Sequence, residues 1–150
     1  MKLPGCPLCE GPGGLPVFEG PKFRVIRAAE AGFPAFYRLV WTGHVAEFSD
    51  LTAADRRLCM DAVALVEQAL RAHLHPAKVN LAALGNVVAH LHWHILARFE
   101  WDSRFPAPVW ALSRREAPPD QLAAIERLLP ALEQELAATL AQRPRKRTGS

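Results

Sequence analysis

The sequence predicts an α+β fold in which an antiparallel sheet is covered by one long helix and a C-terminal helical segment. Three observations lead to this prediction. Two short runs rich in β-branched and aromatic residues come first, a long amphipathic run and two further short runs follow, and a second amphipathic run lies near the end. With 150 residues, of which 50% are hydrophobic, the chain can build the core of one domain, so we expect a single domain over 1–150.

The first 21 residues carry five glycines and five prolines, which predicts loops and turns rather than a helix or a long strand. Residues 23–29 and 36–42 then predict two strands. The stretch EAGFPA between them supplies the Gly and Pro of a connecting turn. Because the N-terminal stretch 1–21 is short, we expect it to be a segment of the same domain rather than a domain of its own.

A long amphipathic helix is predicted in the segment 49–76. Asp50 or Thr52 is its expected N-cap, and Pro76 ends the run. Its apolar residues recur at spacings of three and four: Leu58, Ala62, Leu65, Val66, Ala69 and Leu70.

The second half of the chain adds two strands and a helix. Residues 78–85 predict a third strand and the histidine-containing stretch 87–99 a fourth. The last periodic run, 120–142, has an expected cap at Asp120, and Pro130 is expected to kink or split it.

The charge of the chain points away from a nucleic-acid-binding surface. The formal net charge is +3, but the C-terminal stretch 143–150 holds four basic residues, so the rest of the chain is close to neutral. We expect a flexible, solubilising tail. The sequence shows neither an 18-residue apolar run nor the apolar stretch of a signal peptide, and three cysteines suit a reducing compartment, so a cytoplasmic protein without membrane contact is expected.

The stretch VVAHLHWHILARF places three of the six histidines of the chain at alternate positions: His90, His92 and His94. In a strand, these three side chains share one face, while Trp93 and Ile95 share the other. Three imidazoles side by side add little to packing and repel one another when protonated, so we expect them to be functional.

Two chemistries fit three histidines on one face. They could hold a catalytic zinc ion with an open fourth position. Alternatively, one imidazole could attack phosphorus while the others bind phosphate oxygens. No carboxylate lies between Asn80 and Phe99, whereas Asn86 and Arg98 do, and these groups suit phosphate, so the second chemistry is favoured.

The segment His90-Leu-His92-Trp-His94-Ile-Leu resembles the His-φ-His-φ-His-φ-φ signature of the histidine triad (HIT) family of nucleotidyl hydrolases and transferases. The resemblance extends over roughly residues 5–99. Gly85-Asn86-Val87-Val88 stands where the family has Gly-Gln, a small residue and Val, and LVWTGH, ending at His44, resembles its Pro-Lys-x-His strand. Phe36 replaces a His that many members carry, and Asn86 replaces Gln. These departures concern the substrate more than the reaction.

The resemblance implies a mechanism and a HIT-like fold. His92 would be the nucleophile that attacks the α-phosphorus of a nucleotide, its other NH held by an acceptor such as a backbone carbonyl, and His94 would donate to the phosphate oxygens. Asn80, Asn86 and Arg98 are the expected substrate-binding residues, and His90 is the first histidine of the triad. The implied substrate is a dinucleoside polyphosphate, as in diadenosine polyphosphate hydrolases, or a nucleoside phosphoramidate. Homodimers are typical of such members.

The pair Cys6-Pro-Leu-Cys9 alone is ambiguous between a metal site, a redox pair and two free thiols. Family members with an N-terminal C-x-x-C resemble this chain and imply a zinc site from Cys6, Cys9, His44 and His90. Four such ligands would close the coordination shell, so the zinc would be structural and would make 1–21 a zinc knuckle.

Two other functions compete with this reading. One is a hydrolase whose three histidines hold a catalytic metal. The other is a non-enzymatic, zinc-containing module that binds protein or nucleic acid through its basic tail, although nucleic acid is the less expected partner. Trp110 is expected to pack, with stacking on a nucleobase as the alternative.

Overall fold

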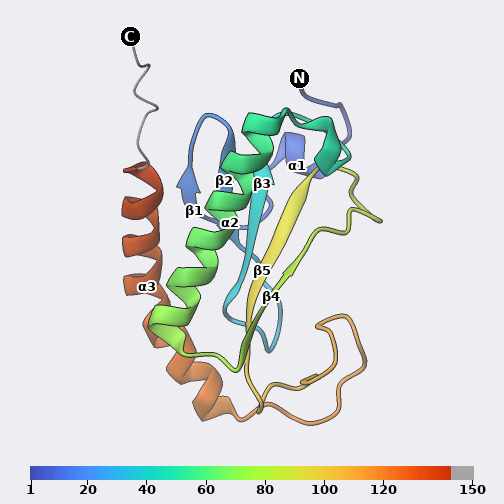
Figure 1. The fold of residues 1–150 in the computed structure, drawn as a ribbon. Coiled ribbons are helices and arrows are strands. Elements are labelled where there is room, and N and C mark those ends of the chain that lie inside the picture. The colour runs from blue at the N-terminus through green and yellow to red at the C-terminus, as the bar shows by residue number, and fades with distance from the viewer. Residues whose placement is uncertain (143–150) are drawn as a thin grey trace.

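The computed structural model describes residues 1–142 and consists of an antiparallel sheet with two long helices on one face (Figure 1). The five strands lie in the order β1-β2-β3-β5-β4. Their bounds are β1 Leu15–Glu19, β2 Phe23–Arg27, β3 Phe36–Trp41, β4 Lys78–Ala82 and β5 His92–Arg98. The helices are α1 Pro7–Glu10, α2 Ala53–Leu74 and α3 Pro119–Ala141, with a 3-10 turn at Phe48–Asp50. The predicted α+β class is confirmed. The tail predicted for 143–150 lies outside the described residues.

Residues 1–21 are predicted to form loops and turns rather than a helix or a long strand, but they also contain the short strand β1 and the one-turn helix α1. Strand β1 pairs antiparallel with β2, and its register shifts between Pro16 and Phe18. The strand lies at the edge of the sheet. A proline, which lacks an N–H donor, is tolerated there because one side of an edge strand has no neighbour to pair with. Helix α1 in the same segment is a single turn, and the Gly and Pro content of the segment gave no sign of a helix.

Helix α2 begins and ends close to the predicted residues. Of the two predicted N-caps, Thr52 takes the position, since its Oγ1 accepts a hydrogen bond from the backbone N–H of Asp55 at 3.1 Å. The helix ends at Leu74, and His75 adopts a left-handed conformation with a φ of 48°.

Helix α3 begins at Pro119, one residue before the expected cap at Asp120, and it runs through Pro130 as one helix. The expected split does not occur. Pro130 is exposed, while Leu129, Leu132 and Leu136 keep the other side of the helix in the core. This packing on both sides of the proline holds the two halves of α3 together.

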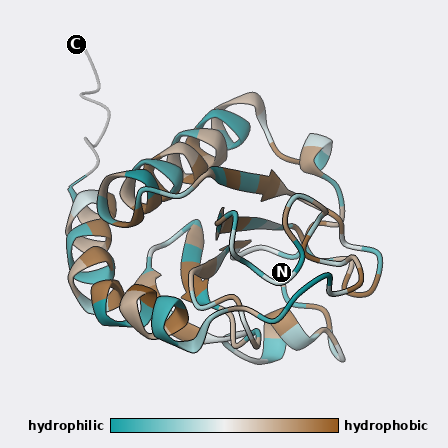
Figure 2. Cartoon of the chain, turned by 90° about the horizontal axis from the view of Figure 1, so that it is seen from below, coloured by the Kyte–Doolittle hydropathy of each residue, from teal (hydrophilic) through white to brown (hydrophobic). Residues whose placement is uncertain are grey.

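The main core lies between the sheet and the two long helices. Tyr37 and Leu39 of β3 and Ile95 of β5 are fully buried there against α2 and α3. Hydropathy colouring shows hydrophobic and hydrophilic residues alternating along both helices, as expected for amphipathic elements (Figure 2). No helix in the described part of the chain has the length and apolar character needed to cross a membrane.

Among residues 1–142, two hydrophobic clusters lie on the opposite face of the sheet, which we call the histidine face. At one end the N-terminal segment contributes Cys6 and Leu8 to a cluster with Ile26 and Val40. At the other end, the connection between β5 and α3, which we call the 99–118 segment, packs over the sheet through Val109. The candidate site lies between these two clusters.

Strand β5 begins at His92 rather than before His90, so the prediction of three histidines on one strand is wrong for His90. His92 and His94 lie on the histidine face, while Ile95 packs against the helices, as the alternation predicted. His90 precedes the strand, where the backbone turns, and its ring is fully buried. The local sequence cannot reveal this turn because His90 continues the same alternation.

Candidate active site and metal centre

Four predicted metal ligands meet at the N-terminal end of the histidine face. The Sγ atoms of Cys6 and Cys9 and the Nδ1 atoms of His44 and His90 all lie within 4.8 Å of one another. Cys9 Sγ is 3.4 Å from both imidazole nitrogens, and the two Nδ1 atoms are 3.2 Å apart. His44 and His90 are far from the two cysteines, and from each other, in the sequence, so the fold itself assembles the cluster.

The three cysteine-to-histidine contacts, each 3.4 Å long, fit a tetrahedral metal ion. Four S and N ligands around zinc lie roughly 3.3–3.8 Å from one another, as follows from the usual Zn–S and Zn–N bond lengths. The contacts from Cys6 and Cys9 to His90 Nδ1, both 3.4 Å, lie in that range. Both cysteines are free thiols. The cluster therefore forms a possible metal-binding site.

The surroundings orient the ligands of this cluster. The Nε2–H of His90 donates to the backbone carbonyl of Trp41 at 2.6 Å, which leaves Nδ1 with the lone pair that a metal needs. Burial lowers the pKa of His90, so its ring is neutral at neutral pH. Helix α1 holds the two cysteines three residues apart, and the backbone N–H of Leu3 donates to Cys9 Sγ at 3.4 Å.

His92 is held by the residue that precedes its strand. Its Nδ1 lies 2.6 Å from the backbone carbonyl of His90, an acceptor for Nδ1–H. The proton on Nδ1 leaves the lone pair on Nε2. The ring is half-buried, so Nε2 is the ring nitrogen available to react.

His94 lies beside His92 in a more enclosed position. It is 6% exposed, and its ring centroid is 4.9 Å from that of His92. The Nε–H of Arg38 donates to His94 Nδ1 at 3.4 Å, which places the His94 proton on Nε2. Burial lowers the pKa of His94 to about 4, and the neighbouring His92 and Arg38 act in the same direction. His94 is therefore a neutral donor at neutral pH.

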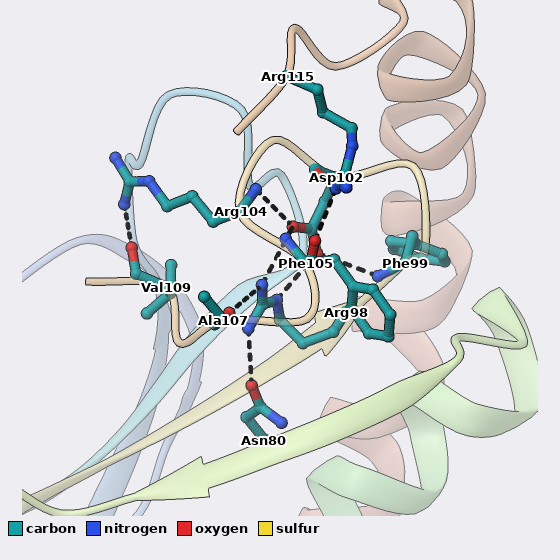
Figure 3. A network of polar contacts seen from close by, with 9 residues as sticks. All are labelled: Asn80, Arg98, Phe99, Asp102, Arg104, Phe105, Ala107, Val109 and Arg115. Carbon is teal, nitrogen blue, oxygen red and sulfur yellow. Dashed lines mark hydrogen bonds and ion pairs between the residues drawn. The ribbon is translucent and has the colours of Figure 1, made fainter. Parts of the chain in front are cut away.

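Arg98 does not lie at the surface of this site. The side chain is 2% exposed, and its Nε and Nη2 donate to the two carboxylate oxygens of Asp102 at 2.9 and 3.0 Å. The remaining Nη1 donates to Asn80 Oδ1 at 2.9 Å (Figure 3). The guanidinium of Arg98 is thus engaged with protein groups, and the expectation that Arg98 binds substrate stays a prediction.

Asp102 organises the 99–118 segment. Besides Arg98, its carboxylate accepts from the backbone N–H groups of Phe99, Arg104 and Phe105 (Figure 3). Burial raises the pKa of Asp102, but hydrogen bonds from the Arg98 side chain and from the backbone N–H groups of Phe99 and Arg104 outweigh this effect, so the pKa lies below its usual value. Arg115 ties the far part of the segment back by donating to the carbonyl of Asp102 at 2.8 Å. The network gives the loop a fixed path.

This path brings Trp110 to the histidine face. Its ring centroid lies 5.2 Å from that of His94, edge to face, and 52% of the residue is exposed. Phe36 contacts the His94 ring from another side, at 5.6 Å. An exposed indole next to His94 can meet a ligand as well as pack, so the alternative that Trp110 stacks on a nucleobase stays a prediction.

The other two predicted substrate residues occupy different environments. Asn80 lies on β4 and is half-buried, and its Oδ1 is occupied by Arg98. Asn86 is exposed in the connection between β4 and β5, where Gly85 has a φ of 75°. A pocket lined by Phe48, Leu84 and Gly85 lies beside His92.

The geometry does not support a catalytic metal held by the three histidines. His90 directs Nδ1 to the cysteines and Nε2 to Trp41, and His92 uses Nδ1 for the His90 carbonyl. Among the described residues 1–142, His90 belongs to the candidate metal cluster, whereas His92 and His94 do not.

Sequence reasoning missed two residues of the site. Arg38 is a charged residue inside the apolar stretch FYRLVWT, which is a signal that could have been noticed. Asp102 stands four residues after Arg98, but nothing local shows that the two are buried together.

Comparisons with known proteins agree with this arrangement. A family model for the HIT domain matches residues 15–101, a range that includes the three triad histidines and His44 but neither Cys6 nor Cys9. A histidine triad protein from Bradyrhizobium japonicum is 28% identical, with a TM-score of 0.69, 83% of this chain covered and 92% of that chain. A second, from Sinorhizobium meliloti 1021, is also 28% identical, with a TM-score of 0.67 and coverages of 83% and 90%.

A more distant relative shares the fold. A Zn-bound histidine triad family protein from Mycobacterium smegmatis is 20% identical, with a TM-score of 0.61 and coverages of 90% of this chain and 97% of that chain. None of the curated proteins matches the sequence.

Proposed function

We propose, from the premise that this chain belongs to the HIT domain family of nucleotide hydrolases and nucleotidyl transferases, that it cleaves an α-phosphate bond of a nucleotide through a covalent nucleotidyl-His92 intermediate. The substrate class that we propose is a dinucleoside polyphosphate or a nucleoside phosphoramidate. The observation that carries the proposal is the 2.6 Å contact between His92 Nδ1 and the His90 carbonyl, because it leaves Nε2 as a free nucleophile.

The proposed reaction has two displacements at phosphorus. In the first, the Nε2 lone pair of His92 forms a bond to the α-phosphorus, and the bond from phosphorus to the leaving group breaks with its electron pair on that group. In the second, water forms a bond to phosphorus and loses a proton to solvent, while the P–N electron pair returns to Nε2. Two easier steps replace one attack of water on a charged phosphate.

His94 supports both displacements as a hydrogen-bond donor. Its Nδ1 accepts from Arg38, so the Nε2–H remains for a phosphate oxygen. The neutral ring that follows from its lowered pKa keeps this proton on Nε2 over the neutral pH range. Asn86, which is exposed on the β4–β5 connection, and the free amide NH₂ of Asn80 are proposed as further donors.

We propose that the metal of the Cys6, Cys9, His44 and His90 cluster is zinc and that it is structural. Four protein ligands fill a tetrahedral shell and leave no position for substrate. When bound, zinc would supply a rigid link between the N-terminal segment and the sheet. His90 would then be fixed through its ring as well as its backbone, and its carbonyl positions His92.

Partners and location are also proposals. Strand β4 is an edge of the sheet and carries the exposed Leu81, so it could pair with β4 of a second copy in a homodimer. Three free cysteines suit the reducing conditions of the cytoplasm.

The test of the proposed function is turnover of matched substrates. A dinucleoside tetraphosphate and a nucleoside 5′-phosphoramidate with the same nucleoside would be incubated with wild type and with His92→Asn. The proposal expects turnover of at least one of the two substrates by wild type and a loss of roughly 10⁴-fold or more in the variant, because the nucleophile is removed. Turnover that persists in the variant, or no turnover of either substrate by wild type, would reject it.

A further inference from the structure

Arg38 occupies a central position on the histidine face. Strands β3 and β5 pair antiparallel with Arg38 opposite His94 and Val40 opposite His92. Residues directly opposite each other in such a pair point to the same side of the sheet. Arg38 therefore lies on the same face as both histidines. It sits directly beside His94 and diagonally across from His92.

The guanidinium of Arg38 is only partly engaged by the protein. Its Nε donates to His94 Nδ1, and its Cζ lies 5.4 Å from the centre of the Phe36 ring. Within residues 1–142, no carboxylate forms an ion pair with Arg38, and its hydrogen bond to His94 does not use Nη1 or Nη2. The charge of Glu30 acts on Arg38 only from a distance.

Three other buried or half-buried arginines are paired with a carboxylate or with backbone carbonyls. Arg98 uses all three guanidinium nitrogens for protein acceptors, and Arg24 donates to three backbone carbonyls. Arg27 pairs with Glu133 at 2.6 Å. Arg38 is also half-buried, and this burial lowers its pKa, which means that its charge is poorly solvated.

The surroundings of Arg38 would favour an anion. A poorly solvated cation next to two imidazoles is unfavourable for folding. Burial is the main cause of the lowered pKa of His94, and the charges of His92 and Arg38 lower it further. The forked Nη1 and Nη2 groups match the geometry of phosphate oxygens and can bind two of them at once.

We propose that Nη1 and Nη2 of Arg38 bind the oxygens of the phosphate adjoining the attacked α-phosphate, so that the enzyme selects dinucleoside polyphosphates over nucleoside phosphoramidates. This inference rests on the proposed function of His92. With the α-phosphate at His92 and His94, the leaving group extends past His94 toward Arg38. A polyphosphate leaving group takes up negative charge as the P–O bond breaks, and Arg38 stabilises that charge. The amine of a phosphoramidate leaves without such charge, so Arg38 stabilises its departure little.

Two variants of Arg38 separate this role from the positioning of His94. Arg38→Gln keeps an amide donor that can reach His94 but removes the charge and the fork. Arg38→Met removes all donors. Arg57→Met is the control for the loss of one positive charge, because Arg57 is exposed on α2, on the other side of the sheet. Thermal unfolding of each variant checks that the fold is kept.

The first readout is kcat/KM for the two substrates of the turnover test. We expect Arg38→Gln to lower the value for the dinucleoside tetraphosphate by roughly 10- to 100-fold, and the value for the phosphoramidate by less than about 3-fold. Equal losses on both substrates would reject the inference, since they would mean that Arg38 acts only through His94 or on the α-phosphate. The proposed function would survive that result as long as wild-type turnover is lost in His92→Asn.

The second readout needs no turnover. Inorganic pyrophosphate is the probe, and its binding to wild type, Arg38→Gln and Arg57→Met is measured by calorimetry. We expect Arg38→Gln to weaken binding by roughly 10-fold or more and Arg57→Met to leave it within about 2-fold of wild type. Pyrophosphate affinity that is the same in Arg38→Gln and wild type would overturn the inference, whatever the outcome of the turnover test.

Discussion

The backbone carbonyl of His90 and the Nδ1 of His92 lie 2.6 Å apart, which joins the metal cluster to the proposed nucleophile through one residue. The ring of His90 meets the two cysteines, while its carbonyl fixes the tautomer of His92. The cluster is thus placed to support the proposed reaction through the backbone of His90. Several measurements can separate the roles of these groups.

The metal cluster should be needed for stability. Cys9→Ser is expected to lose the bound zinc and to lower the melting temperature by roughly 10 °C, because a structural metal contributes several kcal/mol to folding. Elemental analysis of protein purified without added metal, together with thermal unfolding, checks both effects. Cys59→Ala is the matched control, since Cys59 is buried in the main core away from the cluster, and it should keep one zinc per chain. Wild type without zinc would contradict the assignment.

The Arg98–Asp102 pair should contribute strongly to stability. Both side chains are 2% exposed, so Asp102→Ala leaves a buried charge unpaired and should reduce the free energy of unfolding by about 3–5 kcal/mol. Lys22→Ala breaks the Lys22–Asp55 pair, whose lysine is 55% exposed, and should cost less than about 1 kcal/mol. Denaturant unfolding measures both. Similar small losses in the two variants would show that Asp102 does not hold the 99–118 segment.

The stability should depend on pH through His94. The pKa of its ring falls from 6.5 to about 4 on folding, so between these values the unfolded chain binds more protons than the native one. Stability therefore decreases as the pH falls from about 6.5 to about 4, by a total of roughly 3 kcal/mol, and this contribution does not change above that range. Comparing urea unfolding of wild type and His94→Gln over this range isolates the effect, because the other titrating groups are shared. Parallel curves would mean that His94 titrates normally in the native state.

Trp110 should contribute to nucleotide binding. Its exposed indole beside His94 can stack on a nucleobase, so Trp110→Ala is expected to weaken binding of a nucleoside monophosphate by roughly 10-fold, and Trp110→Phe by less. Leu112→Ala is the control, since Leu112 is 90% exposed in the same segment. Titration calorimetry provides the affinities. An unchanged affinity in Trp110→Ala would leave the residue with a packing role alone.

The elements that were predictable from sequence are those with a local signal. The period-two pattern of Trp93 and Ile95 against His92 and His94 gave the correct faces of β5, and the Thr52 cap gave the start of α2. Strand β1 was missed because its Gly- and Pro-rich surroundings resemble a loop, although a strand at the edge of a sheet tolerates proline.

The site was predictable only where a family motif named its residues. Cys6, Cys9, His44 and His90 were expected together and do meet. The contact of Arg38 with His94 depends on β3 and β5 being neighbours, a pairing between distant parts of the chain that no local pattern encodes. The burial of Arg98 likewise depends on the path of the 99–118 segment, so the local sequence gives no sign that its guanidinium contacts that segment.

The central claim is that His92 bonds covalently to phosphorus, and trapping that bond tests it most directly. Wild type is mixed with a dinucleoside tetraphosphate labelled at the α-phosphate, quenched within milliseconds to seconds in alkaline denaturant, and digested. The account predicts label on the peptide that contains His92, lost on mild acid treatment and absent from His92→Asn. Rapid turnover by wild type with no label on that peptide at any quench time would contradict it.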